Sequence, residues 1–199
     1  MARKTGSHSE ITGPKIKQAA LELFARHGFA AVTMRQIAAR VGVQAGSIYN
    51  YTSDKQALLY DLLNGHMADL LTHWAEEQVP HDPAAALDHF VAFHLDFHIQ
   101  RPALVFISYM ELRNLTEENF KAIEEKRSRY EKIVYDMILK GVLSGDFQVP
   151  DAKIASFALI AMLTGVVDWF REDGRLSSEE LTCQYCTLAR QTLGVNATA

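Results

Sequence analysis

Apolar residues recur at the three- and four-residue spacing of an α-helix along most of the chain, and capping and turn residues interrupt them. The first run predicts a helix that opens at Gly13-Pro14, with the proline in its first turn, and ends at His27-Gly28. Its apolar stripe comprises Ile16, Ala19, Ala20, Leu23 and Phe24. No stretch has the strict alternation of a half-buried strand, and no segment repeats. The pattern therefore predicts an all-α fold.

The next segment is expected to hold two short helices separated by a tight turn. Thr33 and Gln36 match the Ser/Thr-x-x-Glu/Gln capping pattern that starts a helix, and Gly42 ends that helix. A second short helix is predicted over residues 44–49, with Ile48 turned inward. Helices of this length and separation are typical of a helix-turn-helix motif, which places its second helix in the major groove of DNA.

Longer apolar helices are predicted after this motif. Ser53 and Gln56 repeat the capping pattern and start a helix over residues 54–77. Asp82-Pro83 supplies an N-cap and a first-turn proline for the next helix, which ends at Ile99. Further helices are expected over residues 103–114, 116–143, 150–170 and 179–193, the last one capped by Ser177 and Glu180.

We therefore divide the chain into a helix-turn-helix head, residues 1–55, and a larger body, residues 56–199. The charge follows this division, since the head holds eight Lys and Arg against three Asp and Glu, while the body holds twelve against twenty-one. A basic head beside an acidic body suits a protein that meets a polyanion with one end. With 199 residues and 48% hydrophobic content, the chain can bury a substantial core.

Cysteine usage and the apolar runs indicate the compartment. Only two cysteines occur, so no disulfide framework is expected and a reducing compartment is the simpler assumption. Residues 1–13 are polar and lack the apolar core of a signal peptide. The longest nearly apolar run, residues 154–167, is too short to cross a bilayer. We expect a cytoplasmic protein with no membrane partner.

The second helix of the motif carries side chains that can face a groove of double-stranded DNA, the expected partner. Gln44 and Ala45 are the candidate base readers, because a glutamine can pair bidentately with adenine and an alanine methyl can pack on a thymine methyl. The candidates for phosphate contacts are Thr33, Arg35, Ser47, Tyr49, Asn50 and Lys55. Ordinary solvated surface is the alternative for any one of them.

Residues 19–59 resemble the head of the tetracycline-repressor (TetR) family of transcriptional regulators. The family signature G-[ST]-[LI]-Y-x-[YH]-[FY]-x-x-K-x-x-L appears here as Gly46, Ser47, Ile48, Tyr49, Asn50, Tyr51 and Lys55. The chain departs from it at Ala45, where Lys is frequent, at Thr52, where Phe is usual, and at Ser53, where Pro is common. The resemblance implies three helices in the head, six in the body, and a homodimer formed by the last two helices.

The helix predicted over residues 150–170 is apolar on nearly all sides and needs covering on more than one of them. Gly165 would allow another helix to approach closely. Under the family resemblance, the candidate dimer-interface residues are Ile160, Leu163, Thr164, Val167, Cys183 and Cys186. Burial of this helix inside the body of one monomer is the alternative.

The body is rich in large apolar and aromatic side chains, and the family resemblance implies an effector pocket among them. The candidate lining residues are Met67, Leu70, Leu71, Trp74, Phe90, Phe93, His94, Phe97, Phe106, Tyr109, Met110, Arg113, Tyr130 and Val134. Plain core packing is the alternative for each aromatic. His94, His98 and Arg113 would suit an amphipathic ligand with a charged end. Residues 165–193 also resemble a branch of the family whose effectors are often acyl-coenzyme A thioesters.

Two pairs of residues carry alternative chemistry. His94 and His98 lie four residues apart and could hold a transition metal, but a third ligand would have to come from another helix. Cys183 and Cys186 form a C-x-x-C without a second pair. We interpret both pairs as structural and expect no metal and no cofactor. No grouping of nucleophile, base and acid occurs, so we do not expect an enzyme; the rival would be a small helical enzyme acting on an acyl thioester.

The sequence thus predicts a homodimeric, ligand-responsive transcriptional repressor. A hydrophobic or amphipathic small molecule, such as an acyl-CoA, is expected to enter the body and release a palindromic operator. The conformational change that releases the operator would pass through the helix over residues 54–77, which joins head and body. Metal or thiol sensing by the two pairs above is the regulatory alternative.

Overall fold

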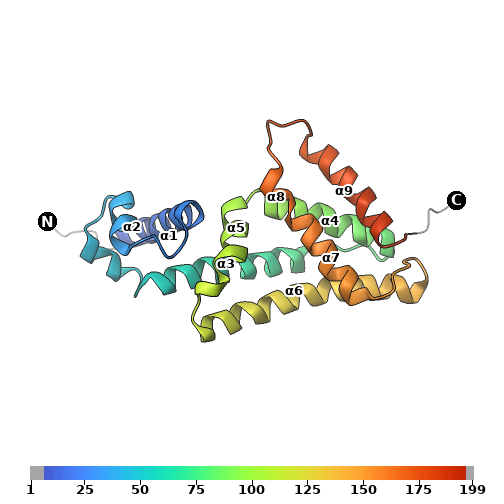
Figure 1. Ribbon diagram of the computed structural model, residues 1–199, viewed down its shortest axis with the longest axis horizontal. Helices are drawn as coiled ribbons and strands as arrows, with labels where there is room; N and C mark the ends of the chain where they lie inside the picture. Colours follow the sequence, from blue (N-terminus) through green and yellow to red (C-terminus); the bar gives the residue numbers. More distant parts are fainter. Residues whose placement is uncertain (1–6, 196–199) are drawn as a thin grey trace. The chain divides into compact units, whose positions relative to one another are not determined.

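The structure is a computed structural model that describes the backbone of residues 7–195 and the side chains from Thr12 onwards. Within residues 7–195 all regular structure is helical, as predicted (Figure 1). The elements are α1 (Ser7–His27), α2 (Met34–Val41), η1 (Ala45–Asn50), α3 (Lys55–Glu76), α4 (Pro83–Ile99), α5 (Pro102–Met110), η2 (Leu112–Asn114), α6 (Glu117–Ser144), α7 (Ala152–Thr164), α8 (Val166–Trp169) and α9 (Ser178–Thr192), where η marks a 3₁₀ helix.

The described residues form two compact units. The first contains the chain up to Ala68 together with Ala103–Glu124, and the second contains Asp69–Pro102 and the chain from Glu125 onwards. The residues that we assigned to the head lie in the first unit, but this unit also includes the start of α3, most of α5, and η2, which we had assigned to the body. α3 and α6 each contribute residues to both units.

The core of the first unit forms where α1 packs against α2 and α2 packs against η1. Phe24 of α1, Ile37 of α2 and Ile48 of η1 are completely buried. Phe29, in the loop between α1 and α2, places its ring 5.3 Å from that of Phe24. Three short helices therefore enclose one apolar centre, as their apolar spacing predicted.

In the second unit α4 is the central helix, packing against α7, α8 and α9. Its apolar surface is wide, and Leu87, Phe90 and Val91 are completely buried. Leu159 of α7 and Ala189 of α9 are also completely buried. This burial on several sides explains why α4 is apolar around most of its circumference rather than along one stripe.

Three predicted helix boundaries are wrong. The helix expected over residues 103–114 ends at Met110, and η2 follows it. α1 begins at Ser7 rather than at Gly13-Pro14, so Pro14 lies inside the helix. A proline removes one hydrogen bond but its fixed φ is compatible with a helix, and the preceding turn is still helical here. The helix predicted over residues 150–170 is interrupted at Gly165, which separates α7 from the short α8. Glycine is the weakest helix former apart from proline.

By length and composition alone, the stretch Ala152–Trp169 is long and apolar enough to cross a membrane, with a mean hydropathy of 1.5. The apolar segment is therefore longer than the run over residues 154–167 that we had judged too short. Only 33% of it is buried inside the protein. Much of this apolar segment is therefore left uncovered by the chain itself.

Candidate DNA-binding head and effector body

The first helix of the helix-turn-helix motif is fixed at both ends by the residues that predicted it. The N–H of Gln36 donates to Thr33 Oγ1 (3.3 Å), and the Gln36 side-chain oxygen accepts from the N–H of Thr33 (2.7 Å). This reciprocal capping box satisfies two of the N–H groups that a helix start leaves open. Gly42 ends α2 with a φ of 79°, a conformation that glycine adopts without strain.

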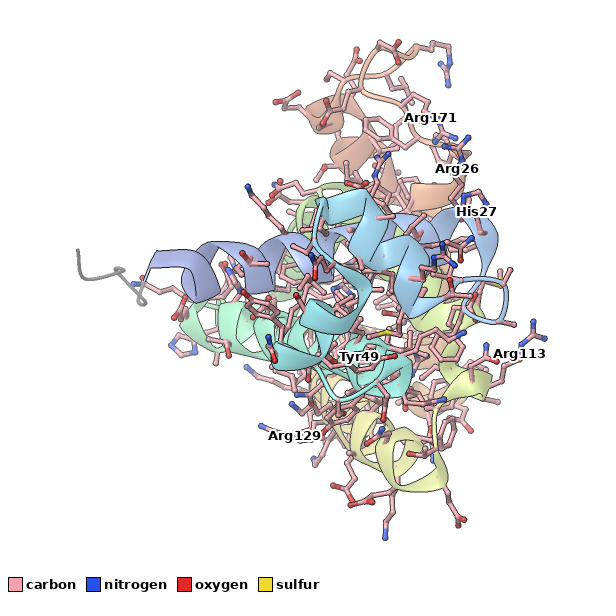
Figure 2. The ribbon with its side chains drawn as sticks, turned by 90° about the vertical axis from the view of Figure 1, so that its left-hand side faces the viewer. Arg26, His27, Tyr49, Arg113, Arg129 and Arg171 are labelled. Atoms are coloured by element: carbon pink, nitrogen blue, oxygen red, sulfur yellow. The ribbon has the colours of Figure 1, made fainter. Side chains whose placement is uncertain are left out.

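The second helix of the motif is a 3₁₀ helix, η1, and not the short α-helix that we predicted. Six residues are few for an α-helix, and 3₁₀ geometry is common in such short pieces. The buried side chain of Ile48 anchors η1, and the N–H of Ser47 donates to the carbonyl of Gln44 (2.9 Å). Tyr49 is 56% exposed and is labelled in Figure 2.

The candidate DNA contacts are mostly on the surface of the head. The exposed members are Thr33, Arg35, Gln44, Ala45, Tyr49 and Asn50, while Ser47 and Lys55 are half-buried. η1 thus presents a polar outer side, as a recognition helix requires. Contact of these residues with DNA stays a prediction.

Lys55 occupies an internal position that its phosphate-binding assignment did not foresee. Its Nζ donates to the carbonyls of Phe29 and Val32, at 2.7 Å each, and lies 4.2 Å from the centroid of the Phe29 ring. Two of its three donors are therefore used to hold the loop between α1 and α2. No local pattern indicates this contact, because 26 residues separate Lys55 from Phe29.

The start of α3 is capped by a different residue from the predicted one. The N–H of Ala57 donates to Asp54 Oδ1 (2.8 Å), so Asp54 takes the role that we assigned to Ser53. Aspartate and serine are similarly good caps, and the two residues are adjacent. The Gln56 side chain, predicted to complete a capping box, instead donates to the carbonyl of Asn114.

Part of the positive charge of the head is neutralised within the first unit. Arg40 pairs with Glu22 at 3.0 Å and Lys17 pairs with Asp61 at 2.9 Å. A hydrogen bond from Gln18 and the pairing with Arg40 lower the pKa of Glu22. Arg35 is exposed and takes part in neither of these two ion pairs, so it is better placed than Arg40 or Lys17 to meet a phosphate.

The candidate effector residues fall into both units. Met67, Phe106, Tyr109, Met110 and Arg113 belong to the first unit, and the second contains Leu70, Leu71, Trp74, Phe90, Phe93, His94, Phe97, Tyr130 and Val134. On α5 the large side chains are open to solvent, with Phe106 39%, Tyr109 47% and Met110 55% exposed. Their role in binding an effector stays a prediction.

In the second unit the candidate aromatics pack on one another. The Trp74 ring lies 5.4 Å from that of Phe90 and 5.1 Å from that of Phe93, both edge-on. Phe90 lies 5.9 Å from Tyr130. Edge-to-face arrangements at these distances are typical of a packed aromatic core. Phe90 and Tyr130 are both buried, so in this structure they are part of the packed core.

A buried polar cluster crosses this aromatic core and joins α4, α6 and α7. His94 is completely buried, and its two ring nitrogens are hydrogen-bonded to the Tyr130 hydroxyl and to Thr164 Oγ1, at 3.0 Å each. His98 stacks on His94 with ring centroids 3.9 Å apart, and its Nδ1–H donates to the His94 carbonyl (2.8 Å). Buried polar groups need such partners.

His98 is neutral at physiological pH. Burial lowers its pKa to about 4, and the nearby charge of Arg101 acts in the same direction, whereas the hydrogen bond to His94 opposes both. Among the residues that the structure describes, no group of three His, Cys, Asp or Glu is placed to hold a metal ion. The two nitrogens of His94 are instead engaged by Tyr130 and Thr164.

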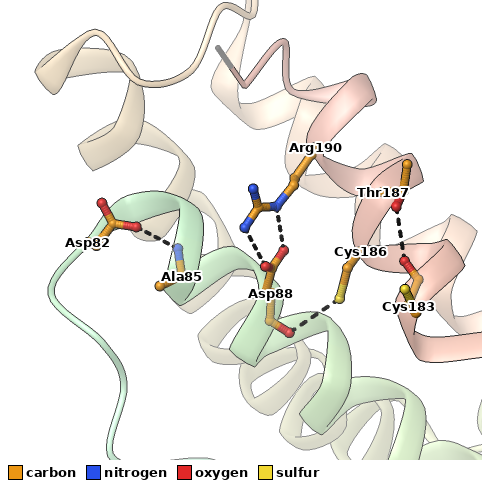
Figure 3. Close-up of polar contacts among 7 residues, drawn as sticks. All are labelled: Asp82, Ala85, Asp88, Cys183, Cys186, Thr187 and Arg190. Atoms are coloured by element: carbon orange, nitrogen blue, oxygen red, sulfur yellow. Dashed lines mark hydrogen bonds and ion pairs between the residues drawn. The ribbon is translucent and has the colours of Figure 1, made fainter. Parts of the chain in front are cut away.

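The two cysteines differ in their surroundings. Cys183 is exposed, while the Cys186 thiol contacts the carbonyl of Asp88 at 3.8 Å (Figure 3). Burial, with a smaller contribution from Asp88, raises the pKa of Cys186 to about 11. A thiol with that pKa is almost entirely protonated at neutral pH and hence a poor nucleophile. Beside it, Arg190 donates to both carboxylate oxygens of Asp88, at 2.9 and 2.5 Å.

The predicted dimer-interface residues are only partly available at the surface. Leu163 and Thr164 are buried inside the protomer, Thr164 against His94, so neither is presented at the surface of the single chain. An interface role for the six residues stays a prediction. Ile160, Val167 and Cys186 are half-buried. The sequence pattern did not tell the inward from the outward side of a helix that is apolar all round.

The outward apolar face of this region consists of other residues. On α7, Ile154 is 67% and Phe157 45% exposed, and Ala158 and Ala161 continue the same face. Their spacing of three, four and seven residues would have identified this face in the sequence. Exposed apolar side chains also occur on α8 and α9, where Trp169 is 52% and Leu188 44% exposed.

A groove of about 620 Å³ lies in the second unit, between α6 and the start of α7. Its lining includes Tyr135, Leu139 and Val142 of α6 with Ser156 and Phe157 of α7. None of the candidate effector residues lines this groove. It is therefore separate from the aromatic cluster that the sequence indicated.

The fold and the head place this chain in a known class of DNA-binding regulators. Residues 16–62 match the model of the bacterial regulatory proteins of the tetR family, and residues 80–193 match that of the tetracyclin repressor-like C-terminal domain. The chain belongs to the TetR family of helix-turn-helix transcriptional regulators.

Individual relatives span almost the whole chain. The HTH-type transcriptional repressor KstR2 of Mycolicibacterium smegmatis is 27% identical over 94% of this chain and 93% of its own length. A regulatory protein of the tetR family from Rhodococcus RHA1 has a similar structure, with a TM-score of 0.86, 26% identity, and coverage of 94% of this chain and 99% of its own. The structure of AibR in complex with isovaleryl coenzyme A and operator DNA shares the fold, with a TM-score of 0.80 and 19% identity over 93% of this chain and all (100%) of its own.

Proposed function

We propose that this protein is a cytoplasmic, homodimeric repressor that binds a palindromic operator and leaves it when an amphipathic effector binds the body. The observation that carries this proposal is η1, whose polar outer side is exposed while Ile48 fixes it to the head. Gln44 and Ala45 would read bases, and Thr33, Arg35, Ser47, Tyr49 and Asn50 would hold phosphates.

The exposed apolar side chains of α7, α8 and α9 are the observation that supports a homodimer. Ile154, Phe157, Trp169 and Leu188 together leave more apolar surface in water than scattered single residues would. A second copy would cover this face through the same residues of its own, since a two-fold interface is formed by the same patch on both subunits. Two heads held in this way would bind half-sites that are about 34–36 Å, or a multiple of that distance, apart.

We propose an acyl-CoA thioester as the effector class. AibR, which shares the fold, has been crystallised with isovaleryl coenzyme A and operator DNA. The acyl chain would lie against the apolar side chains of the body, and the charged coenzyme would remain near solvent because burying unpaired phosphates is very costly. Arg113 and Arg171, both exposed and both labelled in Figure 2, are the candidate charge partners of the coenzyme.

The route from effector to operator would run along α3. This helix begins in the head at Lys55 and carries Met67, Leu70 and Trp74, which are buried. An effector that binds one tilt of α3 better than another shifts the equilibrium between two spacings of the heads. No catalytic step is part of this proposal.

The first test is selection of binding sites from genomic DNA with the purified protein, followed by affinity measurements on the recovered sequence. Replacement Gln44→Ala should relax base preference at one position of each half-site by about 1–3 kcal/mol, while Tyr49→Phe should weaken binding to all sequences alike. Recovery of no common sequence would contradict operator binding.

The second test addresses the effector class. Release of operator DNA is followed by fluorescence anisotropy across matched series of free fatty acids and acyl-CoA thioesters of increasing chain length. Each added methylene that becomes buried against the body should improve release by at most ~0.8 kcal/mol, and free acids should act poorly. Equal potency of acid and thioester would refute the coenzyme part of the proposal.

A further inference from the structure

The loop between α1 and α2 is held from outside by two side chains. It consists of residues 28–33 and leads directly into Thr33, the N-cap of α2. Lys55 holds its carbonyls, as described above, and the carboxylate of Glu111 holds one of its N–H groups: Glu111 Oε1 accepts from the N–H of Phe29 at 3.1 Å. The position of this loop determines where α2 begins.

Glu111 is a buried carboxylate with a polar environment of its own. It is only 6% exposed and follows the last residue of α5, with its N–H bonded to the carbonyl of Ile107 (3.0 Å). Its second oxygen accepts from the side-chain amide of Asn114 in η2. Charged acceptors form the stronger hydrogen bonds, and a buried N–H left without an acceptor is costly.

The backbone geometry of the loop makes this contact close. Gly28 has a φ of 79°, and a Cβ at this position would lie 3.6 Å from Glu111 Oε1. The η2 segment is also tied to α3, because the side chain of Gln56 donates to the carbonyl of Asn114. The contact between Phe29 and Glu111 spans 82 positions of the chain, and that between Gln56 and Asn114 spans 58. These two contacts bring the end of α5, the loop and the start of α3 together in the first unit.

We propose that Glu111 is a positioning residue for DNA binding, which holds the α1–α2 loop and thereby the first helix of the helix-turn-helix motif. The end of α5 is then a second connection between body and head, in addition to α3. This inference rests on the proposed function. Tyr109 and Met110, at the end of α5, immediately precede Glu111, and Phe106 lies one turn earlier. All three are exposed, so a ligand that contacts them would act directly on this connection.

The test compares three full-length variants with the parent protein. Replacement Glu111→Ala removes the acceptor for Phe29, whereas Glu111→Gln keeps an oxygen in the same place, and the Asn114 amide can turn to accept from the new NH₂ group. Asp88→Ala, in the second unit, is the control for removal of a carboxylate far from the head in sequence, because it breaks only the pairing with Arg190.

Operator affinity is measured over a series of salt concentrations. Glu111→Ala should bind roughly tenfold more weakly than the parent with an unchanged salt slope, since no phosphate contact is lost. Glu111→Gln should recover most of the affinity, and Asp88→Ala should keep it. An affinity of Glu111→Ala equal to that of the parent, or a Glu111→Gln as weak as Glu111→Ala, would overturn the proposal.

Amide hydrogen exchange without DNA separates this inference from the proposed function. In Glu111→Ala, exchange should become faster at residues 29–36 and stay unchanged in α4 and α9. Unchanged exchange at residues 29–36 would overturn the positioning role even if the parent binds its operator. A parent that selects no operator would refute the proposed function, while the exchange data would still decide whether Glu111 holds the loop.

Discussion

The head and the second unit are both helical, but different kinds of contact hold them together. In the head, side chains satisfy backbone groups at the ends of short helices, as in the Thr33–Gln36 capping box and the two bonds from Lys55 to the α1–α2 loop. In the second unit, large aromatic side chains pack on α4, and the polar contacts lie inside the core around His94.

This difference indicates how each region can respond. The short helices α2 and η1 depend on a few polar contacts at loops for their position, so loss of one such contact should change DNA binding as well as stability. A packed core with a satisfied polar cluster should respond as one unit. The four predictions below test this contrast, from the largest expected effect to the smallest.

The largest effect is expected from breaking the outward apolar face of α7. Replacement of both Ile154 and Phe157 by aspartate places two charges where a second copy would have to bury them, which should weaken dimerisation more than 100-fold, or by about 3 kcal/mol. Sedimentation measures the oligomeric state, and operator affinity should fall with it. Lys121→Ala, which replaces an exposed residue of α6, is the control and should remain a dimer. Persistence of the parent's oligomeric state in the double variant would exclude this face as the interface.

The second prediction concerns the pH dependence of the second unit. The unfolded chain protonates His98 below its ordinary pKa of 6.5, whereas the folded chain does so only near 4. Between these values the unfolded state binds more protons, so the free energy of unfolding falls as the pH falls, by about 3 kcal/mol in total. Above pH 6.5 this contribution is fully present.

Urea unfolding at several pH values between 7 and 4 measures this dependence. His98→Leu should flatten it, while replacement of the exposed His81 by glutamine should leave it as in the parent. A parent whose unfolding free energy is independent of pH over this range would show that burial of His98 does not control its protonation.

The third prediction separates the two roles of Lys55. As a contact within the head, Lys55 stabilises two carbonyls of the α1–α2 loop, so Lys55→Ala should lower the free energy of unfolding by about 2 kcal/mol and leave the salt slope of operator binding unchanged. As a phosphate contact, its loss would reduce that slope by about 1. Arg35→Ala is the matched comparison, because this exposed residue should change the slope and not the stability. If Lys55→Ala reduces the salt slope of operator binding, Lys55 contacts a phosphate after all.

Local sequence patterns predicted the helices of this chain well, because caps and apolar spacing act over three to eight residues. Thr33 with Gln36, Asp82, and Ser177 with Glu180 cap helices as predicted. The all-α class and the family were also readable, since the signature around Gly46 and Tyr49 is local too. Where two residues compete for the same cap, as Ser53 and Asp54 do, the pattern does not decide between them.

Contacts between distant residues were not readable from the sequence. Lys55 was assigned to phosphate binding because its type and place suit that role, yet its partners Phe29 and Val32 lie more than twenty positions earlier. Likewise, nothing local indicated that Thr164 faces His94, 70 positions away, rather than a second copy. For α7, apolar on nearly all sides, only the packing of the fold distinguishes the inward from the outward face.

The smallest effect is expected at the ion pair between α4 and α9. Arg190 and Asp88 form two parallel hydrogen bonds, but their side chains are 44% and 33% exposed, so water and salt screen the attraction. Asp88→Asn should lower the free energy of unfolding by less than about 1 kcal/mol, with a smaller effect at high salt. Urea unfolding at low and high salt measures this. Asp136→Asn, which breaks the more exposed pair with Lys132 within α6, is the comparison and should cost even less.

The same Asp88→Asn variant also tests what protects the Cys186 thiol. Because burial is the main cause of the raised pKa of Cys186 and Asp88 is a lesser one, the thiol should stay unreactive towards a disulfide reagent at pH 8 in Asp88→Asn. Rapid modification of Cys186 in that variant would mean that the charge of Asp88, rather than burial, protects the thiol.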